Sequence, residues 1–311
     1  MGTIAVLDDY QGRASEFANW AELAAPVRFI RQHLEGDELV RAVADCEIVV
    51  AMRERTPITA EVINALAKLE LLVTTGMANA AIDVEAAHTR GITVCGTPSG
   101  GASTVELTWA LLLAAVKHLP LEDRSMREGR WQVSLASDLA GKRLGLIGLG
   151  RLGAAMVPIA QAFSMEVVAW SQNLTPERAA EVGAGMVGKE ELIATSDIVS
   201  IHLRLSDRTR GLLGAKEIAT MRAGALLLNT SRGPIVDEQA MIAALKDQRI
   251  FAALDVYDVE PLPVGHPLTS LDNVVIAPHL GYASESNMAM MYAGVVEDIA
   301  AFLEGSPIRV I

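Results

Sequence analysis

The stretch Leu144-Gly-Leu-Ile-Gly148-Leu-Gly150-Arg-Leu-Gly153 decides the fold. A short apolar run enters glycines at the G-x-G-x-x-G spacing, and residues 154–163 follow with a helical pattern despite Pro158. Strand, tight turn and helix in this order are typical of a dinucleotide-binding unit. Gly148 permits the turn, Gly150 lets backbone approach a pyrophosphate, and Gly153 lets the helix pack on the strand. The alternative, an ordinary glycine-rich βα turn, is less favoured in this context.

The strand after this fingerprint ends in residues that can donate hydrogen bonds. An NAD site usually places Asp or Glu there to accept from the ribose hydroxyl. This chain has Trp170-Ser171-Gln172-Asn173, without a carboxylate that would repel a 2′-phosphate. The candidates to donate to such a phosphate, which would favour NADP, are Ser171, Gln172, Asn173 and Arg178. The alternative is that these are solvated loop residues and the cofactor is NAD.

Apolar runs alternate with helical patterns along both halves of the chain, and an apolar helix is expected over residues 103–118. The runs are continuous, as in parallel strands that are buried on both faces. This order of elements predicts a doubly wound α/β architecture. Thr59 is a candidate helix N-cap. The expected strands span residues 4–7, 27–30, 48–51, 71–74, 92–95, 143–147, 166–170, 197–201, 225–228, 252–255 and 273–276.

Composition narrows the class of protein. The chain has 311 residues, 51% of them apolar, with 38 acidic and 26 basic residues and a net charge of −12. This length suggests about two domains, and the apolar content excludes general disorder. The acidic balance argues against nucleic acid or an anionic membrane as partner.

The longest apolar run, residues 107–116, is about half the length of a spanning helix, and no signal peptide is expected. The two cysteines, Cys46 and Cys95, favour a reducing cytoplasm, and no metal site is predicted.

Three segments at expected strand ends carry candidate catalytic residues. They are Leu228-Asn-Thr-Ser-Arg232-Gly-Pro-Ile-Val-Asp-Glu238, Ala253-Leu-Asp255-Val-Tyr-Asp-Val-Glu260-Pro-Leu-Pro263 and Val275-Ile-Ala-Pro-His279-Leu-Gly281. Ligands of parallel sheets bind at the carboxyl ends of strands. An Arg that binds carboxylate and carbonyl oxygens, a His that exchanges a proton and a Glu that orients it suit oxidation of an alcohol beside a carboxylate.

Each of these residues also has a purely structural interpretation. Arg232 could be a helix-entry charge, Glu260 a solvated turn residue and His279 a capping or core histidine. Their joint position in the cofactor half favours function. His202 also follows a strand and is the rival base, although a structural role is favoured for it. The remaining histidines fall on other helix or loop patterns.

At these motifs the chain resembles the D-isomer-specific 2-hydroxyacid dehydrogenases. The resemblance runs over nearly the whole length and keeps the motif order. It implies that Arg232 binds substrate, that Glu260 pairs with His279 and that His279 is the acid/base. It also implies that Asp255 holds the nicotinamide carboxamide and that Arg151, Thr104, Leu203 and Thr230 line the cofactor groove. With these five, the candidate cofactor residues are Gly148, Gly150, Leu152, Gly153 and Ser171.

The family's substrate-carboxylate loop matches residues 76–83, where the backbone amides of Met77 and Ala78 would bind the carboxylate. Ala78 and Ala80 depart from the family's second glycine and first aspartate, and backbone donation survives both changes. Arg53 matches a position that reaches the distal end of the substrate and would suit an acidic tail. An exposed helix-entry charge is the equal alternative. Arg204 replaces a common proline and either adds charge for a phosphate or is solvated.

The resemblance also implies a topology and an assembly. A Rossmann cofactor domain, residues 101–282, would be inserted in a flavodoxin-like substrate domain of residues 1–100 plus 283–311. A cleft would close over a small 2-hydroxy or 2-keto acid, and the helix from Ser103 would serve a homodimer. The alternative function is a non-catalytic dinucleotide sensor, like the family's transcriptional corepressor branch. Formate dehydrogenase is disfavoured, because that branch carries Gln in place of Glu260.

Overall fold

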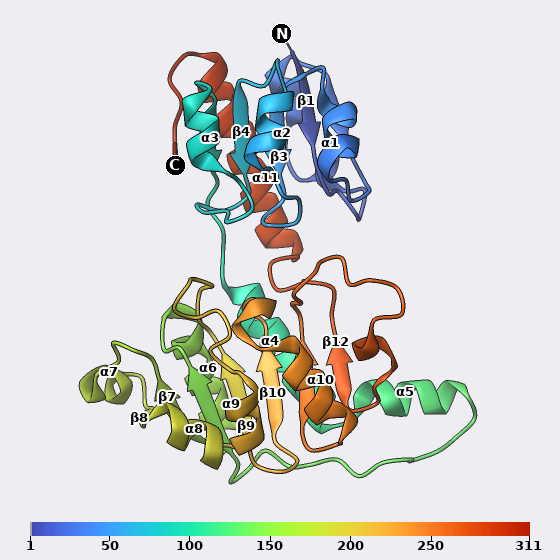
Figure 1. Ribbon diagram of the computed structural model, residues 1–311, viewed down its shortest axis with the longest axis vertical. Coiled ribbons are helices and arrows are strands. Elements are labelled where there is room, and N and C mark those ends of the chain that lie inside the picture. Colours follow the sequence, from blue (N-terminus) through green and yellow to red (C-terminus); the bar gives the residue numbers. More distant parts are fainter. Residues whose placement is uncertain (1) are drawn as a thin grey trace. The chain divides into compact units, whose positions relative to one another are not determined.

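The computed structural model describes residues 2–311. The chain forms two compact units. Unit 1 comprises the residues up to Gly100 together with Tyr282–Ile311, and unit 2 comprises Gly101–Gly281. Figure 1 shows the elements of each unit, coloured along the chain.

Unit 1 is built on a five-stranded parallel sheet with the order β2-β1-β3-β4-β5. This 2-1-3-4-5 order is that of flavodoxin-like folds. The strands are β1 (Thr3–Val6), β2 (Val27–Phe29), β3 (Cys46–Ala51), β4 (Leu71–Thr74) and β5 (Thr93–Gly96).

Helices cover both faces of this sheet, because alternate strand residues point to opposite sides. Ala5 and Leu7 pack with α1, α2 and α3, whereas Ile4 and Val6 pack with η2 and α11. Side-chain caps from Thr59, Asp83 and Ser284 begin three of these helices. The bounds are η1 (Ala14–Glu16), η2 (Trp20–Leu23), α1 (Gly36–Val43), α2 (Ala60–Ala65), α3 (Val84–Thr89) and α11 (Glu285–Leu303).

Unit 2 contains a seven-stranded parallel sheet with the order β12-β11-β10-β9-β6-β7-β8. Counted from β6, this is the Rossmann order extended by one strand, and its topological switch point lies between β6 and β9. The strands are β6 (Arg143–Ile147), β7 (Glu166–Trp170), β8 (Gly185–Met186), β9 (Ile198–Ile201), β10 (Leu226–Asn229), β11 (Phe251–Leu254) and β12 (Val274–Ile276).

The second sheet is also covered on both faces. Leu144 and Leu146 face a core with α4, α6 and α7, whereas Val199 and Leu227 face a core with α8, α9 and α10. The helices are α4 (Ala102–Val116), α5 (Leu119–Arg127), α6 (Arg151–Ala162), α7 (Pro176–Glu181), α8 (Lys189–Thr195), α9 (Ala215–Thr220), η3 (Gly233–Ile235), α10 (Glu238–Lys246) and η4 (Pro267–Ser270).

The predicted α/β class, with two doubly wound parallel sheets, is confirmed, and every expected strand is present within one or two residues. Thr59 caps α2 through a bond from the Val62 amide. Two details differ from expectation. The helix after the fingerprint begins at Arg151 rather than residue 154, because Gly150 is its N-cap. The two-residue strand β8 was not anticipated, because so short an edge strand leaves no apolar run.

Within residues 2–311, no single helix combines the length and apolar composition of a membrane span. Helices α4 and α5 have this length and composition only when they are taken together, and the pair is bent by 62°.

We expect the substitution Gly145→Ala to destabilise unit 2 by about 1–3 kcal/mol, the usual cost of overpacking. Gly145 lies in β6, and a Cβ there would overlap the Ser196 hydroxyl and lie 2.6 Å from Leu192 Cδ2 in α8. Urea unfolding followed by circular dichroism measures the effect. The matched control is Gly185→Ala, where the nearest atom to the new Cβ is 3.7 Å away. Equal unfolding midpoints for both variants would contradict this packing.

Candidate functional site

The turn after β6 is shaped by glycines that no larger residue can replace. Gly148 has φ +103°, and a Cβ there would lie 2.6 Å from the His202 carbonyl oxygen. A Cβ on Gly153 would overlap the carbonyl oxygen of Gly148. By contrast, no atom lies within 4 Å of where a Cβ would stand on Gly150, at the N-terminus of the 12-residue α6. Open backbone at a helix N-terminus fits the pyrophosphate of a dinucleotide.

Arg151 connects this turn to a second helix start. Its guanidinium lies across Gly101, the N-cap of α4, where a Cβ would stand 2.5 Å from Arg151 Nη1. The turn therefore combines an arginine with the amino ends of α4 and α6, an environment that favours an anion.

The other predicted cofactor residues lie around the same sheet edge. Thr104 donates its hydroxyl to the Gly281 carbonyl at 2.7 Å, and Thr230 bonds to the Thr108 hydroxyl at 2.8 Å. Leu203 Cδ2 lies beside Gly148, within 2.9 Å of where a Cβ would stand. Leu152 and Ser171 are half-buried.

His279 and Glu260 form a close pair in unit 2. His279 Nδ1 lies 2.5 Å from Glu260 Oε2. The other carboxylate oxygen, Oε1, accepts the Tyr257 amide at 2.9 Å, so both oxygens of Glu260 are engaged. Glu260 therefore fixes the orientation of the imidazole through Nδ1. The other ring nitrogen, Nε2, is the one suited to exchange a proton.

Asp255 holds the backbone that follows the histidine. Its two oxygens accept the amides of Leu280 at 2.7 Å and Gly281 at 2.8 Å. Burial raises the pKa of Asp255 to about 6, and these two amide bonds partly oppose the shift. His279 itself adopts φ 54°, a left-handed conformation that is uncommon for a residue with a Cβ.

Arg232 follows β10 on a turn that packs against the backbone of the segment carrying Glu260. A Cβ on Gly233 would overlap the carbonyl group of Tyr257, so only glycine permits this approach. Asn229 stabilises the same turn by donating to the Arg232 carbonyl at 2.9 Å and accepting the Ser231 amide at 3.0 Å. The structure thereby brings Arg232, Glu260 and His279 to the carboxyl ends of the neighbouring strands β10, β11 and β12.

The rival histidines have structural partners. Burial lowers the pKa of His202 to about 4, and its Nε2 bonds to the Ser200 hydroxyl at 2.9 Å. A histidine that stays neutral across the physiological pH range is a poor proton donor. His266 caps η4 and lies 3.3 Å from Glu238. Among the described residues, no group of three or more His, Cys, Asp or Glu side chains is placed to hold a metal ion.

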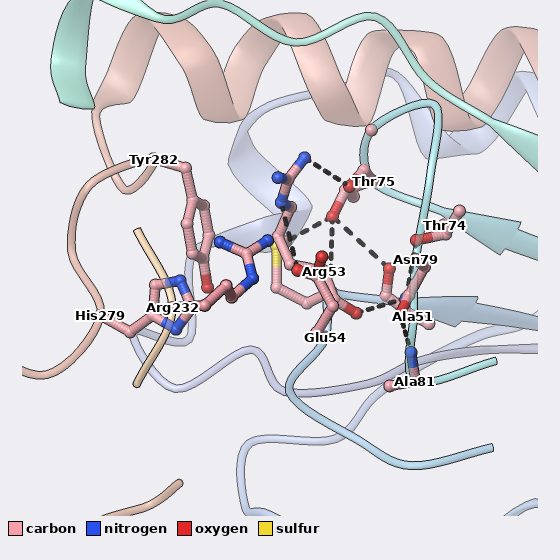
Figure 2. Close-up of polar contacts among 12 residues, drawn as sticks. Ala51, Arg53, Glu54, Thr74, Thr75, Asn79, Ala81, Arg232, His279 and Tyr282 are labelled. Atoms are coloured by element: carbon pink, nitrogen blue, oxygen red, sulfur yellow. Dashed lines mark hydrogen bonds and ion pairs between the residues drawn. The ribbon is translucent and has the colours of Figure 1, made fainter. Parts of the chain in front are cut away.

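In unit 1, the loop after β4 contains two consecutive exposed residues with unpaired backbone amides. Met77 and Ala78 are exposed, and their amides donate to no other residue in the described part of the chain. Gly76 precedes them with φ +101°, and its amide donates to the Thr97 hydroxyl at 3.0 Å. The Arg53 guanidinium occupies the space where a side chain on Gly76 would lie. Figure 2 shows Arg53 and the polar groups around it.

Sequence reasoning missed two residues whose contacts shape the candidate site, Asn79 and Gly233. Asn79 is buried and bonds to the Arg53 carbonyl at 2.5 Å. An isolated polar residue inside a loop gives no sequence signal of burial. Gly233 is adjacent to a predicted site residue, but its close neighbour Tyr257 is distant in sequence.

The comparisons with known proteins agree on one family. A model described as the NAD binding domain of D-isomer specific 2-hydroxyacid dehydrogenase matches residues 109–281. The chain is 37% identical over 286 residues to D-3-phosphoglycerate dehydrogenase of Archaeoglobus fulgidus, which covers 90% of this chain and 54% of that protein. It is 37% identical over 275 residues to glyoxylate reductase of Korarchaeum cryptofilum, which covers 86% of this chain and 82% of that one.

Solved structures extend this similarity to the whole chain. A phosphoglycerate oxidoreductase from Vibrio cholerae has a TM-score of 0.94 at 32% identity and covers 98% of this chain and 100% of its own. This chain spans only about half the length of the Archaeoglobus fulgidus relative.

The raised pKa of Asp255 predicts a pH-dependent stability. The folded protein binds this proton more tightly than the unfolded chain, whose carboxyl has the ordinary value of 3.8. The resulting stabilisation is full below about pH 4 and is lost as the pH rises through about 6. We expect the free energy of unfolding of the wild type, minus that of Asp255→Asn, to fall by about 2–3 kcal/mol between pH 4 and pH 7. Urea titrations at each pH measure the difference.

The control for this titration is the exposed Asp207→Asn in the same unit. Its difference from wild type should change by less than about 0.5 kcal/mol over the same range. A pH-independent difference for Asp255→Asn would contradict the raised pKa.

Proposed function

Because this chain belongs to the D-isomer specific 2-hydroxyacid dehydrogenase family, we propose that it interconverts a small D-2-hydroxy acid and the matching 2-keto acid with NAD(P). The observation that supports the proposal best is the His279–Glu260 pair, 2.5 Å apart in the unit with the glycine fingerprint. An oriented imidazole beside a carboxylate is a suitable acid/base for an alcohol proton.

His279 is the proposed acid/base. In the reductive direction Nε2 donates a proton to the carbonyl oxygen of the substrate, and in the oxidative direction it removes the hydroxyl proton. Glu260 faces Nδ1 at hydrogen-bond distance and holds the imidazole in this orientation. Asp255 positions His279 by holding the two amides that follow it.

Arg232 and the loop of unit 1 are the proposed substrate-binding groups. The guanidinium of Arg232 suits the carbonyl oxygen and the carboxylate of a 2-keto acid, because its donors form a fork that matches two adjacent oxygens. The unpaired amides of Met77 and Ala78 suit the carboxylate. Arg53 is the second cation in this set, placed by its contact with Gly76.

The glycine turn at Gly148, Gly150 and Gly153 fits NAD(P), because a Cβ at the first or third position would collide with backbone while the second is open. A bound nicotinamide supplies or accepts the hydride. Arg151 would face the pyrophosphate, with Leu152, Leu203, Thr104, Thr230 and Asp255 along the groove. We favour NADP over NAD, because Ser171 stands where a carboxylate would repel a 2′-phosphate.

A homodimer in a reducing cytoplasm completes the proposal. Both cysteines are buried and free. The segment after α5 is held by Glu122, which accepts the Ser134 amide at 2.7 Å, yet it leaves large apolar side chains in solvent. Trp131 is 75% and Leu135 92% exposed. An ordered segment that buries so little of its own apolar surface is suited to packing on a second copy.

We expect the protein to oxidise NADPH, and NADH less efficiently, with glyoxylate, hydroxypyruvate or a bulkier 2-keto acid as substrate. In His279→Ala, turnover should fall by at least about 100-fold, because the proton donor is lost. Binding of the dinucleotide should persist, as measured by fluorescence titration. The control is His88→Ala, an exposed histidine of unit 1. Undiminished turnover in His279→Ala would refute the mechanism, and tight dinucleotide binding without any turnover in wild type would favour a sensor.

Two substitutions test the proposed dimer surface. Trp131→Ser combined with Leu135→Glu should convert a particle with the mass of two chains into one with the mass of a single chain, measured by sedimentation. A charge at a buried apolar interface opposes association. Val264→Glu, at an equally exposed apolar position elsewhere in unit 2, should leave the mass unchanged. A monomeric wild type would overturn this part of the proposal.

A further inference from the structure

The buried amide of Asn79 joins three segments of unit 1. Its Nδ2 donates to the Arg53 carbonyl at 2.5 Å and to the Thr74 hydroxyl at 2.9 Å, and its Oδ1 accepts the Ala81 amide at 2.9 Å. Asn79 is 7% exposed, so water offers little replacement for these bonds. The side chain therefore ties the turn after β3 to the end of β4 and to its own loop (Figure 2).

Arg53 has a backbone conformation that needs such support. Its φ is 52°, in the left-handed region that side chains with a Cβ rarely adopt. The Arg53 amide donates to the Thr75 hydroxyl at 2.9 Å, and the Arg53 carbonyl accepts from Asn79. The residue is thus held on both sides by side chains that follow β4.

This backbone conformation directs the guanidinium over the exposed loop. Arg53 Nη1 donates to the Thr75 carbonyl at 3.3 Å and fills the space beside Gly76. The amides of Met77 and Ala78 come next in the chain, and they are the proposed carboxylate ligands. The position of Arg53 relative to these amides therefore depends on the loop geometry that Asn79 fixes.

The hydrogen bonds of Asn79 distinguish a positioning role from a role in filling volume alone. An apolar side chain of similar size would fill the same volume but would leave the Arg53 carbonyl and the Ala81 amide without their side-chain partner. Buried backbone groups are strongly selected to be paired, so the turn would relax toward another conformation.

We propose that Asn79 is a positioning residue for substrate binding: it locks Arg53 in the left-handed conformation that places its guanidinium beside the Met77–Ala78 amides, and it thereby sets the affinity for the anionic end of the 2-keto acid. This inference rests on the function proposed above, because that function assigns the loop to the substrate carboxylate. Asn79 makes no contact with the reacting atoms in this scheme and acts through Arg53.

A double-mutant cycle tests the coupling. We expect Asn79→Asp, which keeps the acceptor for Ala81 but loses the donor to Arg53, to raise the KM for the preferred 2-keto acid about 10-fold with kcat changed less than about 3-fold. Arg53→Ala should raise KM at least as much. The double variant should be no worse than Arg53→Ala alone, because the effect of Asn79 passes through Arg53.

Two further variants keep the test decisive if Asn79→Asp is poorly folded. Thr75→Val removes the acceptor for the Arg53 amide and should reproduce the rise in KM, whereas Thr75→Ser retains a hydroxyl and should restore wild-type KM. Asn64→Asp, exposed on α2, controls for the added negative charge in the same unit. Additive effects in the cycle, or a loss confined to kcat, would overturn the inference while leaving the proposed function intact.

Calorimetric titration of oxalate, an unreactive small dicarboxylate, separates this inference from the function. If wild type reduces no 2-keto acid, the proposed function fails. The role of Asn79 is then decided by measuring the affinity for oxalate of wild type, the two single variants and the double variant. Weaker, non-additive oxalate binding in Asn79→Asp supports the positioning role. Unchanged oxalate affinity, or no oxalate binding by wild type, refutes it.

Discussion

Direct contact between backbone segments is the constraint on which the candidate site of unit 2 depends. Gly153 lies against the carbonyl of Gly148, and Gly233 lies against the carbonyl group of Tyr257. In each pair a single methyl group would force the segments apart. The first contact sets the opening at the N-terminus of α6, and the second sets the Arg232 turn against the segment that carries Glu260. Close packing of protein interiors transmits such a shift instead of absorbing it.

The two carboxylates of this site are held by hydrogen bonds to backbone amides and to His279. Glu260 uses one oxygen for the Tyr257 amide and the other for His279. Asp255 uses both oxygens for the amides after His279. Burying a carboxylate is costly unless its oxygens are paired, and the raised pKa of Asp255 shows that two amides offset only part of that cost. The burial of Asp255, which holds the backbone after His279, therefore lowers the folding stability at neutral pH.

Sequence reasoning succeeded where the signal is local. Continuous apolar runs predict buried parallel strands, and the glycine spacing predicts the turn after β6, because both patterns reflect the chain's immediate neighbours. It failed where the cause is distant in sequence. The contact of Gly233 with Tyr257 spans 24 positions, and the bond of Asn79 to Arg53 spans 26. It also failed for β8, whose two residues pair with β7 by backbone bonds that carry no side-chain pattern.

The same device recurs in the two units. His279 in unit 2 and Arg53 in unit 1 both adopt left-handed backbone conformations, with φ of 54° and 52°. Each is fixed by a buried polar side chain that bonds to nearby backbone, Asp255 in one case and Asn79 in the other. A strained conformation of this kind costs about 1–2 kcal/mol and persists only where its surroundings determine it. Asp8, which is also left-handed with φ 57°, is held in a similar way, because its carbonyl accepts from the buried Arg55 at 2.8 Å. Under the proposed function, preorganisation of this kind would reduce the conformational entropy lost on binding, because the arginine and the histidine would be ordered before a substrate arrives.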